Sequence, residues 1–314
     1  MLGAVAGLLV VAIAWFGVAR VTAPGRAVRV LSDAALARTA AGDGLRIVAW
    51  NIAHGRGLAR NNFDGGDRDV RARRLERIAQ RLARLDADVG VLNEVDFDSS
   101  WSHGVDQARV LADALGMPHR AKQRNWDAAV PFFRVAFGNA ILSRFPLGDC
   151  ALLDYPARSR WGELAGGKKR GLHCVVSAPS HRFRLVAVHL DHLDAPTRVE
   201  SAAMIAKLHG ADRLPLVLAG DFNTGPTGYP EVDAPAGGTA LDRLVAAGLH
   251  VPPQVTPTPP HFTFRADAPR RVIDWVLVPR DWHIESWQAL NTRDSDHRPV
   301  MAVVRPAGEV RDPH

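Results

Sequence analysis

The chain has 314 residues, of which 47% are hydrophobic and 23% are charged. This composition is typical of a folded globular protein, and it excludes a wholly disordered or collagen-like chain. Two cysteines, Cys150 and Cys174, are too few for a disulfide-stapled scaffold or an all-cysteine zinc site. A disulfide between them and two buried free thiols are equally supported. The formal net charge of +6 favours acidic or phosphate-bearing partners, although we attribute most of the arginine excess to a GC-rich coding sequence.

The first segment of the chain, residues 2–19, contains no charged residue. As a helix it would rise about 27 Å, close to the thickness of the hydrocarbon core of a bilayer. It lacks the basic start and the cleavage site of a signal peptide, so we favour an uncleaved membrane anchor over residues 1–20 to a cleaved signal or a buried helix. We expect a catalytic domain outside the cytoplasm, secreted if the segment is cleaved. Arg20, Arg26 and Arg29 conflict with this orientation under the positive-inside rule.

A linker is expected after this segment. Pro24 and several glycines within residues 21–44 predict irregular chain, with a short helix over residues 31–40. The folded domain is then expected over residues 45–306, followed by a tail at residues 307–314.

From residue 45 onward, runs rich in Val, Ile and Leu alternate with helical patterns. The runs have the length of buried strands, and they predict strands at residues 45–50, 89–93, 136–142, 172–177, 183–190, 214–219, 272–278 and 300–304. Apolar spacings of three and four predict helices at residues 69–85, 105–115, 197–209 and 239–247. Residues 252–260 are rich in proline and predict a loop. Many strands with few helices between them favour two packed sheets with helices outside, an α/β sandwich.

Polar side chains recur where the predicted strands begin or end. They are Asn51, Glu94, His189, Asp221, Asn223, Asp274, Asp296 and His297. Any one of them is commonly a turn former, a helix cap or a satisfied core residue. A whole set of carboxylates, amides and imidazoles at strand ends instead indicates a ligand site, because such sites collect there in sheet proteins.

Seven short motifs follow one another in a fixed order along the domain. They are Ala49-Trp50-Asn51-Ile52, Val91-Leu92-Asn93-Glu94-Val95, Gly138-Asn139-Ala140-Ile141-Leu142-Ser143-Arg144, Val188-His189-Leu190, Gly220-Asp221-Phe222-Asn223, Ile273-Asp274-Trp275-Val276-Leu277 and Ser295-Asp296-His297-Arg298-Pro299-Val300. Together they resemble the endonuclease/exonuclease/phosphatase superfamily, which includes DNase I, neutral sphingomyelinases, abasic-site endonucleases and inositol-phosphate 5-phosphatases. The resemblance implies the DNase I-like fold, a four-layer α/β sandwich with two packed, mostly antiparallel sheets flanked by helices.

The resemblance also implies a metal site. Glu94 resembles the principal Mg²⁺ ligand, assisted by Asn51 and Asp296, with Mn²⁺ as the alternative ion. Magnesium prefers oxygen ligands and keeps several waters, so one or two carboxylates suffice. Asn93 stands where many members have Gln, a departure that leaves the ligand intact.

The catalytic roles implied by the resemblance belong to five residues. Asp221 and Asn223 resemble the pair that positions the attacking water and a phosphate oxygen. His297 resembles the histidine beside the scissile phosphate, oriented by Asp274. His189 resembles the second active-site histidine, a leaving-group acid or phosphate donor. The general base stays open between Asp221 and the Asp274–His297 pair, which would titrate as a coupled unit.

Weaker candidates for substrate binding are Asn139, Arg170 and His192. Asn139 is expected to support the site, Arg170 to reach the substrate phosphate and His192 to line the cleft. His54, Arg56 and Asn62 lie on the glycine-rich loop after Asn51 and are expected to touch substrate. The aromatic residues Trp126, Phe132 and Phe133 are expected in a long loop, where a small satellite core is favoured over lipid insertion or base stacking.

The apolar amino terminus favours a Mg²⁺-dependent hydrolase of a membrane or lipid-linked phosphodiester. The alternative is a secreted or membrane-anchored nuclease of the DNase or RNase type, which the positive charge favours. An inositol-phosphate 5-phosphatase ranks third, because that subgroup has Cys-Asp-Arg where this chain has Ile273-Asp274-Trp275. A catalytically silent binding module is the alternative of another class, and the presence of Glu94 and His297 argues against it. No protein partner is predicted.

Overall fold

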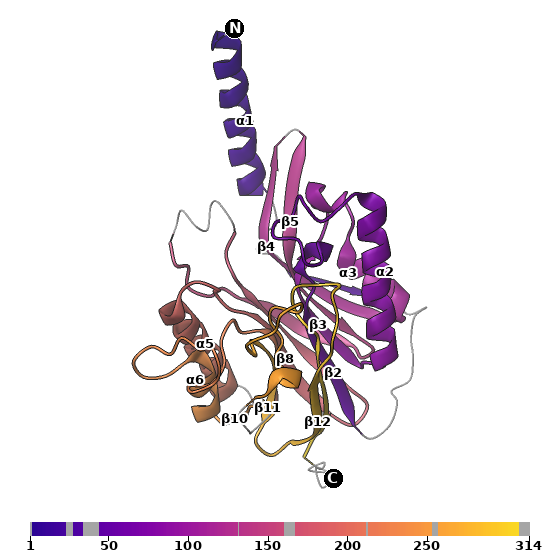
Figure 1. Ribbon diagram of the computed structural model, residues 1–314, viewed down its shortest axis with the longest axis vertical. Coiled ribbons are helices and arrows are strands. Elements are labelled where there is room, and N and C mark those ends of the chain that lie inside the picture. The colour runs from indigo at the N-terminus through magenta and orange to yellow at the C-terminus, as the bar shows by residue number, and fades with distance from the viewer. Residues whose placement is uncertain are drawn as a thin grey trace.

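The computed structural model describes residues 2–22, 28–33, 44–130, 132–159, 167–211, 213–252 and 257–307. Within them the strands form a seven-stranded and a six-stranded sheet, and Figure 1 shows the sheets between two pairs of helices. The first sheet has the order β1-β4-β5-β3-β2-β13-β12. Its strands are β1 (Val28–Ser32), β4 (His119–Val130), β5 (Phe133–Ser143), β3 (Val89–Asp96), β2 (Leu45–Asn51), β13 (Val300–Arg305) and β12 (His283–Ala289).

The second sheet has the order β10-β11-β9-β8-β7-β6. Its strands are β10 (Leu249–His250), β11 (Asp274–Pro279), β9 (Leu216–Asp221), β8 (Arg182–His189), β7 (Gly171–Ser177) and β6 (Leu147–Leu153). Each sheet contains one parallel pair, β2 with β3 in the first and β8 with β9 in the second. The other named pairs are antiparallel.

The alternation of side chains along β2 explains how the layers stack. Ile47 and Ala49 join the core cluster between the two sheets, together with side chains of β8 and β11. Val48 and Trp50 point to the opposite face, where they pack under two helices. Successive side chains of a strand face opposite sides, so a strand that is apolar on both faces is covered on both.

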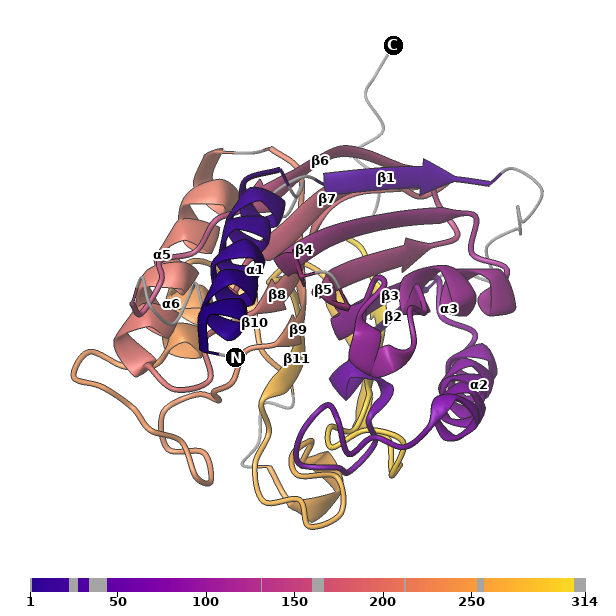
Figure 2. The ribbon, with the colours of Figure 1, turned by 90° about the horizontal axis from the view of Figure 1, so that it is seen from above.

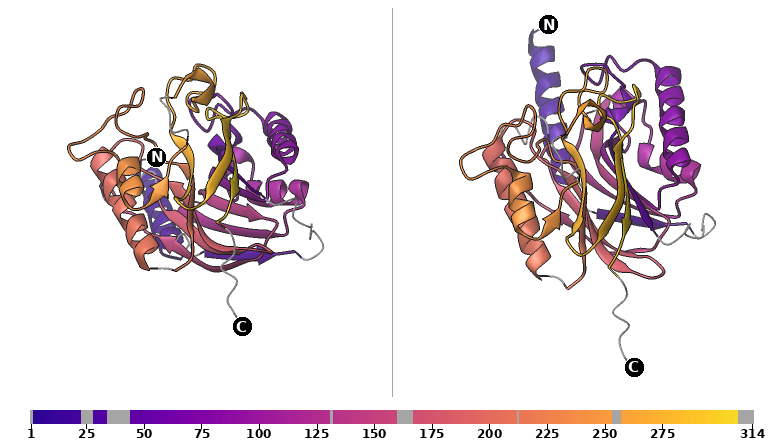
Figure 3. Two further views of the ribbon diagram at one scale, coloured as in Figure 1. Left: turned by 90° about the horizontal axis from the view of Figure 1, so that it is seen from below. Right: turned by 60° about the horizontal axis from the view of Figure 1, so that its bottom comes forward.

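The helices α2 (Arg68–Leu85) and α3 (Gln107–Leu115) cover the outer face of the first sheet, and α5 (Ala195–Ala211) and α6 (Ala240–Ala246) cover the second. Figure 3 shows the two pairs on opposite sides of the sheets. Leu75, Ile78 and Leu82 form the buried stripe of α2. Asp67 caps the start of that helix by accepting the N–H of Val70 at 2.8 Å. The four layers confirm the predicted DNase I-like α/β sandwich.

The eight predicted strands and four predicted helices are all present, with ends that differ by a few residues. The strands β1, β4, β6, β10 and β12 were not predicted. β4 reads as a polar sequence, yet Gln123 and Asn125 within it are buried because the strand is covered on both sides. Trp126 and Phe133 therefore lie in the β4–β5 hairpin, not in the expected loop.

The stretch expected to be a linker contains part of the first sheet. Residues 28–32 form β1, which pairs antiparallel with β4 at the sheet edge. The helix expected over residues 31–40 is wrong at its start, because Leu31 and Ser32 are in this strand. The rest of that prediction, residues 34–40, falls outside the described residues, as do residues 253–256 of the proline-rich segment and residues 308–314 of the tail.

The amino-terminal segment forms the helix α1 (Leu2–Thr22). It projects from the sandwich beside the β4–β5 hairpin, as Figures 1 and 2 show. Among the described residues, no helix combines the length and apolar character needed to cross a bilayer. The predicted membrane-spanning helix over residues 1–20 is therefore not confirmed.

A disulfide joins Cys150 of β6 to Cys174 of β7. The two strands are antiparallel neighbours, and their register shifts between Gly148 and Ala151. The structure thus decides between the two alternatives that the sequence left open.

Candidate active site

The predicted site residues converge where the two sheets meet. In the first sheet, Asn51 of β2 lies opposite Asn93 of β3. In the second sheet, Asp221 of β9 lies between His189 of β8 and Asp274 of β11. Because β2 and β3 are parallel, and β8 and β9 are parallel, each pair brings its carboxyl-terminal residues to one edge.

Asn93 joins the two sheets at this edge. Its side-chain nitrogen donates to the backbone oxygen of Val188 at 3.0 Å, and its Oδ1 accepts the N–H of Asp221 at 3.0 Å. Gly220 has a φ of +135°, and a Cβ there would collide with the Val188 carbonyl oxygen. Glycine is therefore required for the close approach of β8 and β9 beside the site.

Glu94 leaves the regular strand geometry. Its φ is +50°, and the register between β3 and β5 shifts between Leu92 and Val95. A left-handed conformation is costly for a glutamate and concentrates at functional sites. The irregularity turns the Glu94 carboxylate out of the alternating pattern and toward the convergent residues.

His297 forms a buried pair with Asp274. Its Nδ1 lies 2.9 and 3.1 Å from the two carboxylate oxygens of Asp274. Burial alone would lower the pKa of His297, but the carboxylates of Asp274 and Asp221 outweigh it and raise the pKa to about 10. His297 is therefore an imidazolium at neutral pH, with its Nε2 at 3.9 Å from Asp221 Oδ2.

The pKa of Asp221 is also raised, but burial is the cause. Burial raises its pKa to about 6, although the charge of His297 and the hydrogen bond from Asn51 act against this rise. Asn51 Nδ2 donates to Asp221 Oδ2 at 3.1 Å, and the backbone N–H of Asn223 donates to Oδ1 at 2.9 Å. The carboxyl group is thus held in place and titrates close to neutrality, as a general base requires.

His189 is the second histidine beside Asp221. Its Nε2 lies 3.7 Å from Asp221 Oδ2 and 2.5 Å from Lys169 Nζ. Burial lowers the pKa of His189 well below its ordinary value, and the nearby ammonium of Lys169 lowers it further. His189 is therefore a neutral imidazole, unlike His297.

Glu94 and Asp296 share one guanidinium. Arg56 Nη1 donates to Glu94 Oε2 at 3.1 Å, and Nη2 donates to Asp296 Oδ2 at 2.8 Å. Burial would raise the pKa of Glu94, but His54, Lys169 and Arg56 together lower it well below its ordinary value. Glu94 is thus fully ionised, and the loop after β2 supplies the positive charge that balances it.

The donor set around Glu94 fits a hard cation. Glu94 and Asp296 supply carboxylate oxygens, and Asn51 supplies an amide oxygen that also accepts the N–H of Ala53 at 3.0 Å. These are the ligand types that Mg²⁺ prefers. The two carboxylates already share one cationic group, which shows that this position stabilises positive charge.

A second group could also hold a metal ion. Ligand atoms of Asp221, Asp274 and His297 all lie within 4.8 Å of one another. His297 Nδ1 is hydrogen-bonded to Asp274, and the neighbouring carboxylates raise the pKa of His297 to about 10, so the three residues are also suited to acid–base chemistry. The oxygen donors around Glu94 are the other place in the site where a cation could bind.

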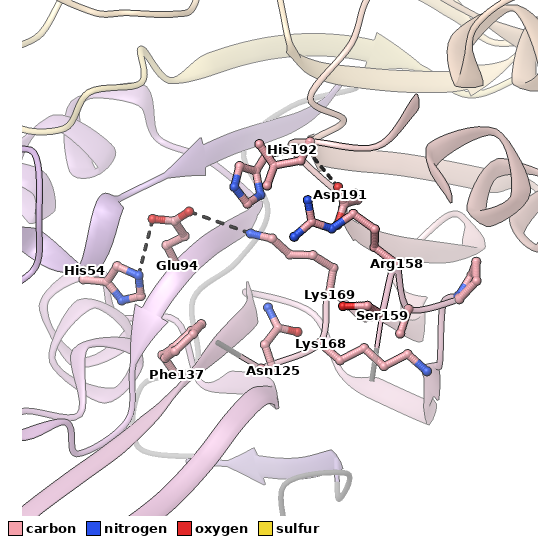
Figure 4. A pocket seen from close by; sticks show the side chains of 14 residues that line it. His54, Glu94, Asn125, Phe137, Arg158, Ser159, Lys168, Lys169, Asp191 and His192 are labelled. Atoms are coloured by element: carbon pink, nitrogen blue, oxygen red, sulfur yellow. Dashed lines mark hydrogen bonds and ion pairs between the residues drawn. The ribbon is translucent and has the colours of Figure 1, made fainter. Parts of the chain in front are cut away.

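A cavity of about 430 Å³ opens beside Glu94 and His54. Figure 4 shows the ammonium group of Lys169 inside it, between Glu94 and His192. His192 thus lies in the cleft wall, as its position after His189 suggested.

Arg170 and Asn139 do not line this cavity. Arg170 Nε donates to Asp154 at 3.0 Å, and its Nη1 donates to the backbone of Asn125 at 2.9 Å. Asn139 is fully buried and donates to Gln123 Oε1 and to the backbone of Arg170. Both residues support the segment that carries Lys169.

Lys169 and Asp96 were not predicted as site residues. Arg170 was predicted from the run Lys168-Lys169-Arg170, whereas it is Lys169 that contacts His189. The one available signal was the position of this run just before a strand. Asp96 binds Nδ1 of His54 at 2.8 Å and so directs the opposite ring nitrogen toward Glu94.

Comparison with solved structures agrees with this fold. A protein of the endonuclease/exonuclease/phosphatase type from Beutenbergia cavernae is 22% identical, with a TM-score of 0.64 over 85% of this chain and 72% of that one. The human nocturnin catalytic domain with bound sulfate is 17% identical, with a TM-score of 0.60 over 88% of this chain and 97% of that one. A mannosyl-6-phosphatase of Bacteroides thetaiotaomicron is 18% identical, with a TM-score of 0.57 over 83% of this chain and 99% of that one.

No functionally curated protein matches the sequence closely enough to count as a relative. A family model does match, over residues 48–297, which takes in β2, the site and His297. All the residues that converge at the sheet edges lie within this span. The chain belongs to the endonuclease/exonuclease/phosphatase family.

Proposed function

We propose that the protein is a Mg²⁺-dependent hydrolase of phosphodiester bonds that acts on a membrane or lipid-linked substrate. Membership of the family supports a phosphoester hydrolase in general. The single observation that carries the proposed hydrolysis is the position of Asp221. Its Oδ2 lies within 4 Å of a protonated His297 and of a neutral His189, and the ionised Glu94 lies 3.9 Å from the same Nε2 of His189.

This arrangement assigns the steps of hydrolysis to named residues. Asp221, with a pKa of about 6, accepts the proton of the attacking water. The new phosphorus–oxygen bond forms as the bond to the leaving oxygen breaks. His297, whose pKa is raised to about 10, carries a proton at neutral pH, so it gives that proton to the leaving oxygen, while neutral His189 orients the phosphate.

The metal would be held by Glu94, Asp296 and Asn51. When bound there, Mg²⁺ supplies charge neutralisation at a phosphate oxygen and helps to orient the group. Arg56 already bridges the two carboxylates, so it keeps them at a fixed separation.

A membrane or lipid-linked substrate is supported by apolar side chains outside the sandwich. Leu8 and Val10 of α1 are more than half exposed, and Phe132 in the β4–β5 turn is 98% exposed. The helix and the hairpin lie beside each other in Figure 1. Exposed apolar groups gathered in this way are typical of surfaces that bind lipid or protein.

A position outside the cytoplasm belongs to the same proposal. The disulfide between Cys150 and Cys174 supports it, because such bonds form and persist mainly in oxidising compartments. A nuclease remains the second candidate function, favoured by the lysines and arginine that line the cavity.

The first test is hydrolysis of bis-p-nitrophenyl phosphate by the purified protein. We expect activity with Mg²⁺ that EDTA abolishes, and a fall of at least about 100-fold in kcat for Glu94→Gln and for His297→Gln. Arg84→Gln, on the exposed face of α2, is the control and should keep wild-type activity. Activity that persists in EDTA, or in both site variants, would refute the proposal.

The second test uses supercoiled DNA, RNA, sphingomyelin vesicles and phosphatidylinositol vesicles as substrates. Turnover of lipid well above nicking of DNA supports the lipid-linked substrate. Nicking of DNA or cleavage of RNA far above lipid turnover overturns it in favour of the nuclease.

A further inference from the structure

The cavity beside Glu94 extends away from the reacting centre. His54, Glu94 and Phe137 line one end and Arg158 lines the other, with His192 between them in Figure 4. In Figure 4 the side chains of Arg158, Lys169 and His192 converge on the space between these ends. His189, Asp221 and His297, which surround the reacting phosphate in the proposed mechanism, are not part of this lining.

The charges of the lining favour an anion. Arg158, Lys168 and Lys169 line the cavity together with two carboxylates, Glu94 and Asp191. The three cations exceed the two carboxylates by one, and Glu94 Oε1 lies 3.9 Å from Lys169 Nζ. Glu94 Oε2 accepts from Arg56 at 3.1 Å, and Asp191 Oδ1 accepts the N–H groups of Leu193 and Asp194 at 2.8 and 2.7 Å.

Two of the three cations, Arg158 and Lys169, point into the cavity. Lys168 pairs with Asp154 at 3.1 Å, whereas the guanidinium of Arg158 and the ammonium of Lys169 point toward each other in Figure 4, with His192 beside them. Burial lowers the pKa of His192, and the charge of Lys169 lowers it further. Like charges that converge on one space are stabilised by an anion bound between them.

The remaining wall is apolar. Phe137, Pro156, Ala157 and Leu193 contribute to it. A ligand that fits this lining has a ring-sized or chain-like body between two anionic ends. One end would lie at His189 and Asp221, and the other at Arg158 and His192. Lys169 reaches both, because its Nζ is 2.5 Å from His189 Nε2 while its stem lines the cavity.

We propose that the cavity lined by Arg158, Lys169 and His192 binds a second phosphate of the substrate, so that the preferred substrate is a phosphodiester with a further phosphate on one of its alcohols. This inference rests on the proposed phosphodiesterase function and narrows its substrate class. It disfavours lipids such as sphingomyelin, whose choline group would bring a positive charge to the cationic end of the cavity.

The test compares two chromogenic substrates that differ by one phosphate. They are the p-nitrophenyl ester of thymidine 5′-phosphate and the same compound with a 3′-phosphate, both assayed with Mg²⁺. We expect the wild-type KM to be at least about tenfold lower for the compound with the second phosphate, as for one added charge-assisted hydrogen bond. In Arg158→Gln and His192→Gln the ratio of the two KM values should fall toward one.

The matched control is Arg84→Gln, which removes an exposed arginine from α2 and should retain the wild-type ratio. Equal KM values in the wild type would overturn the inference, and so would a ratio that is unchanged in both cavity variants.

A binding measurement separates this inference from the proposed function. Absence of p-nitrophenol release from either compound and from bis-p-nitrophenyl phosphate would count against the proposed function alone. Calorimetric titration in EDTA with thymidine 5′-phosphate and thymidine 3′,5′-bisphosphate then tests the cavity. Tighter binding of the bisphosphate by at least about tenfold, lost in Arg158→Gln, supports the second-phosphate site. Equal affinities overturn it.

The source of the second phosphate is tested with vesicles of phosphatidylinositol or of phosphatidylinositol 4-phosphate. Preference for the phosphorylated lipid that is lost in Arg158→Gln indicates a lipid headgroup. Discrimination within the thymidine pair without discrimination between the vesicles indicates a nucleotide. Discrimination in neither pair overturns the inference.

Discussion

Asp221 has two histidine neighbours, and the buried charges around it drive their pKa values apart. Asp274 and Asp221 raise the pKa of His297 to about 10 despite its burial. Burial and Lys169 lower the pKa of His189 well below its ordinary value. His297 can therefore carry a proton while His189 beside it stays neutral, because the pKa of each histidine is set by its own neighbours.

The residue scale yields a prediction for Lys169→Met. Removal of the ammonium group should raise the pKa of His189, because it eliminates the second-largest cause, after burial, of the lowered pKa. The pKa should remain below the ordinary histidine value, since burial is unchanged. The measurement is a pH titration of the imidazole resonances by NMR in EDTA.

Lys168→Met is the control for this substitution, because the ammonium of Lys168 pairs with Asp154 instead. A His189 pKa that does not change in Lys169→Met would show that the Lys169 charge has no effect on that imidazole.

Single residues of the site were predictable where a motif marks a strand end. Asn51, Glu94 and Asp221 were found in this way and do converge. Lys169 was not, because it lies in an irregular segment before β7, where sequence has no period that tells which side chain faces inward.

At the scale of secondary-structure elements, the pairing of β6 with β7 is reinforced covalently. Cys150 and Cys174 are 24 residues apart in the sequence, and the disulfide closes this loop. Loop closure of this length reduces the entropy of the unfolded chain, which stabilises the folded protein by about 3 kcal/mol.

Reduction of the disulfide should therefore lower the free energy of unfolding by about 3 kcal/mol. The measurement is urea unfolding, followed by circular dichroism, with and without dithiothreitol. A double variant, Cys150→Ser with Cys174→Ser, should resemble the reduced protein and should not respond to dithiothreitol. A reducing agent that has no effect on wild-type stability would contradict the prediction.

The elements that the sequence did not predict share a physical cause. β1 and β12 are edge strands with mostly exposed side chains, so they lack the apolar run of a buried strand. β4 carries buried polar residues, and one of them, Gln123, accepts a hydrogen bond at 3.1 Å from Asn139 of the neighbouring strand. Local sequence does not reveal such partners.

At the scale of the whole molecule, Asp294 connects α2 to the segment that leads to the site. Its two carboxylate oxygens accept from Arg77 and Arg81, each at 2.7 Å. Burial would raise the pKa of Asp294, but the hydrogen bonds from these arginines lower it below the ordinary value of 3.8. These hydrogen bonds fix the segment that carries Asp296 and His297 relative to α2.

We expect Asp294→Asn to lower the free energy of unfolding at neutral pH by about 1 kcal/mol, since both arginines are partly exposed and screened by solvent. Because the folded-state pKa is lowered, this stabilisation is fully present above pH 3.8 and is lost as the pH falls through the lowered pKa. Urea unfolding of the wild type and the variant should therefore differ at about pH 6 and converge toward about pH 3.

Asp113→Asn is the control, because its ion pair with Arg120 is longer, at 3.7 Å, and more exposed. An equal loss of stability in the two variants, or a difference for Asp294→Asn that grows as the pH falls, would contradict the prediction.

The sequence by itself determined the buried strands, the amphipathic helices and the order of the motifs at the strand ends. These features are encoded locally, because a period of two or of 3.6 residues records which side of an element is buried. Only the tertiary structure decided that Arg56 bridges Glu94 and Asp296, that Lys169 rather than Arg170 faces His189, and that the two cysteines are joined. Such pairings depend on the distance between segments far apart in the chain, and that distance is set by how the two sheets pack.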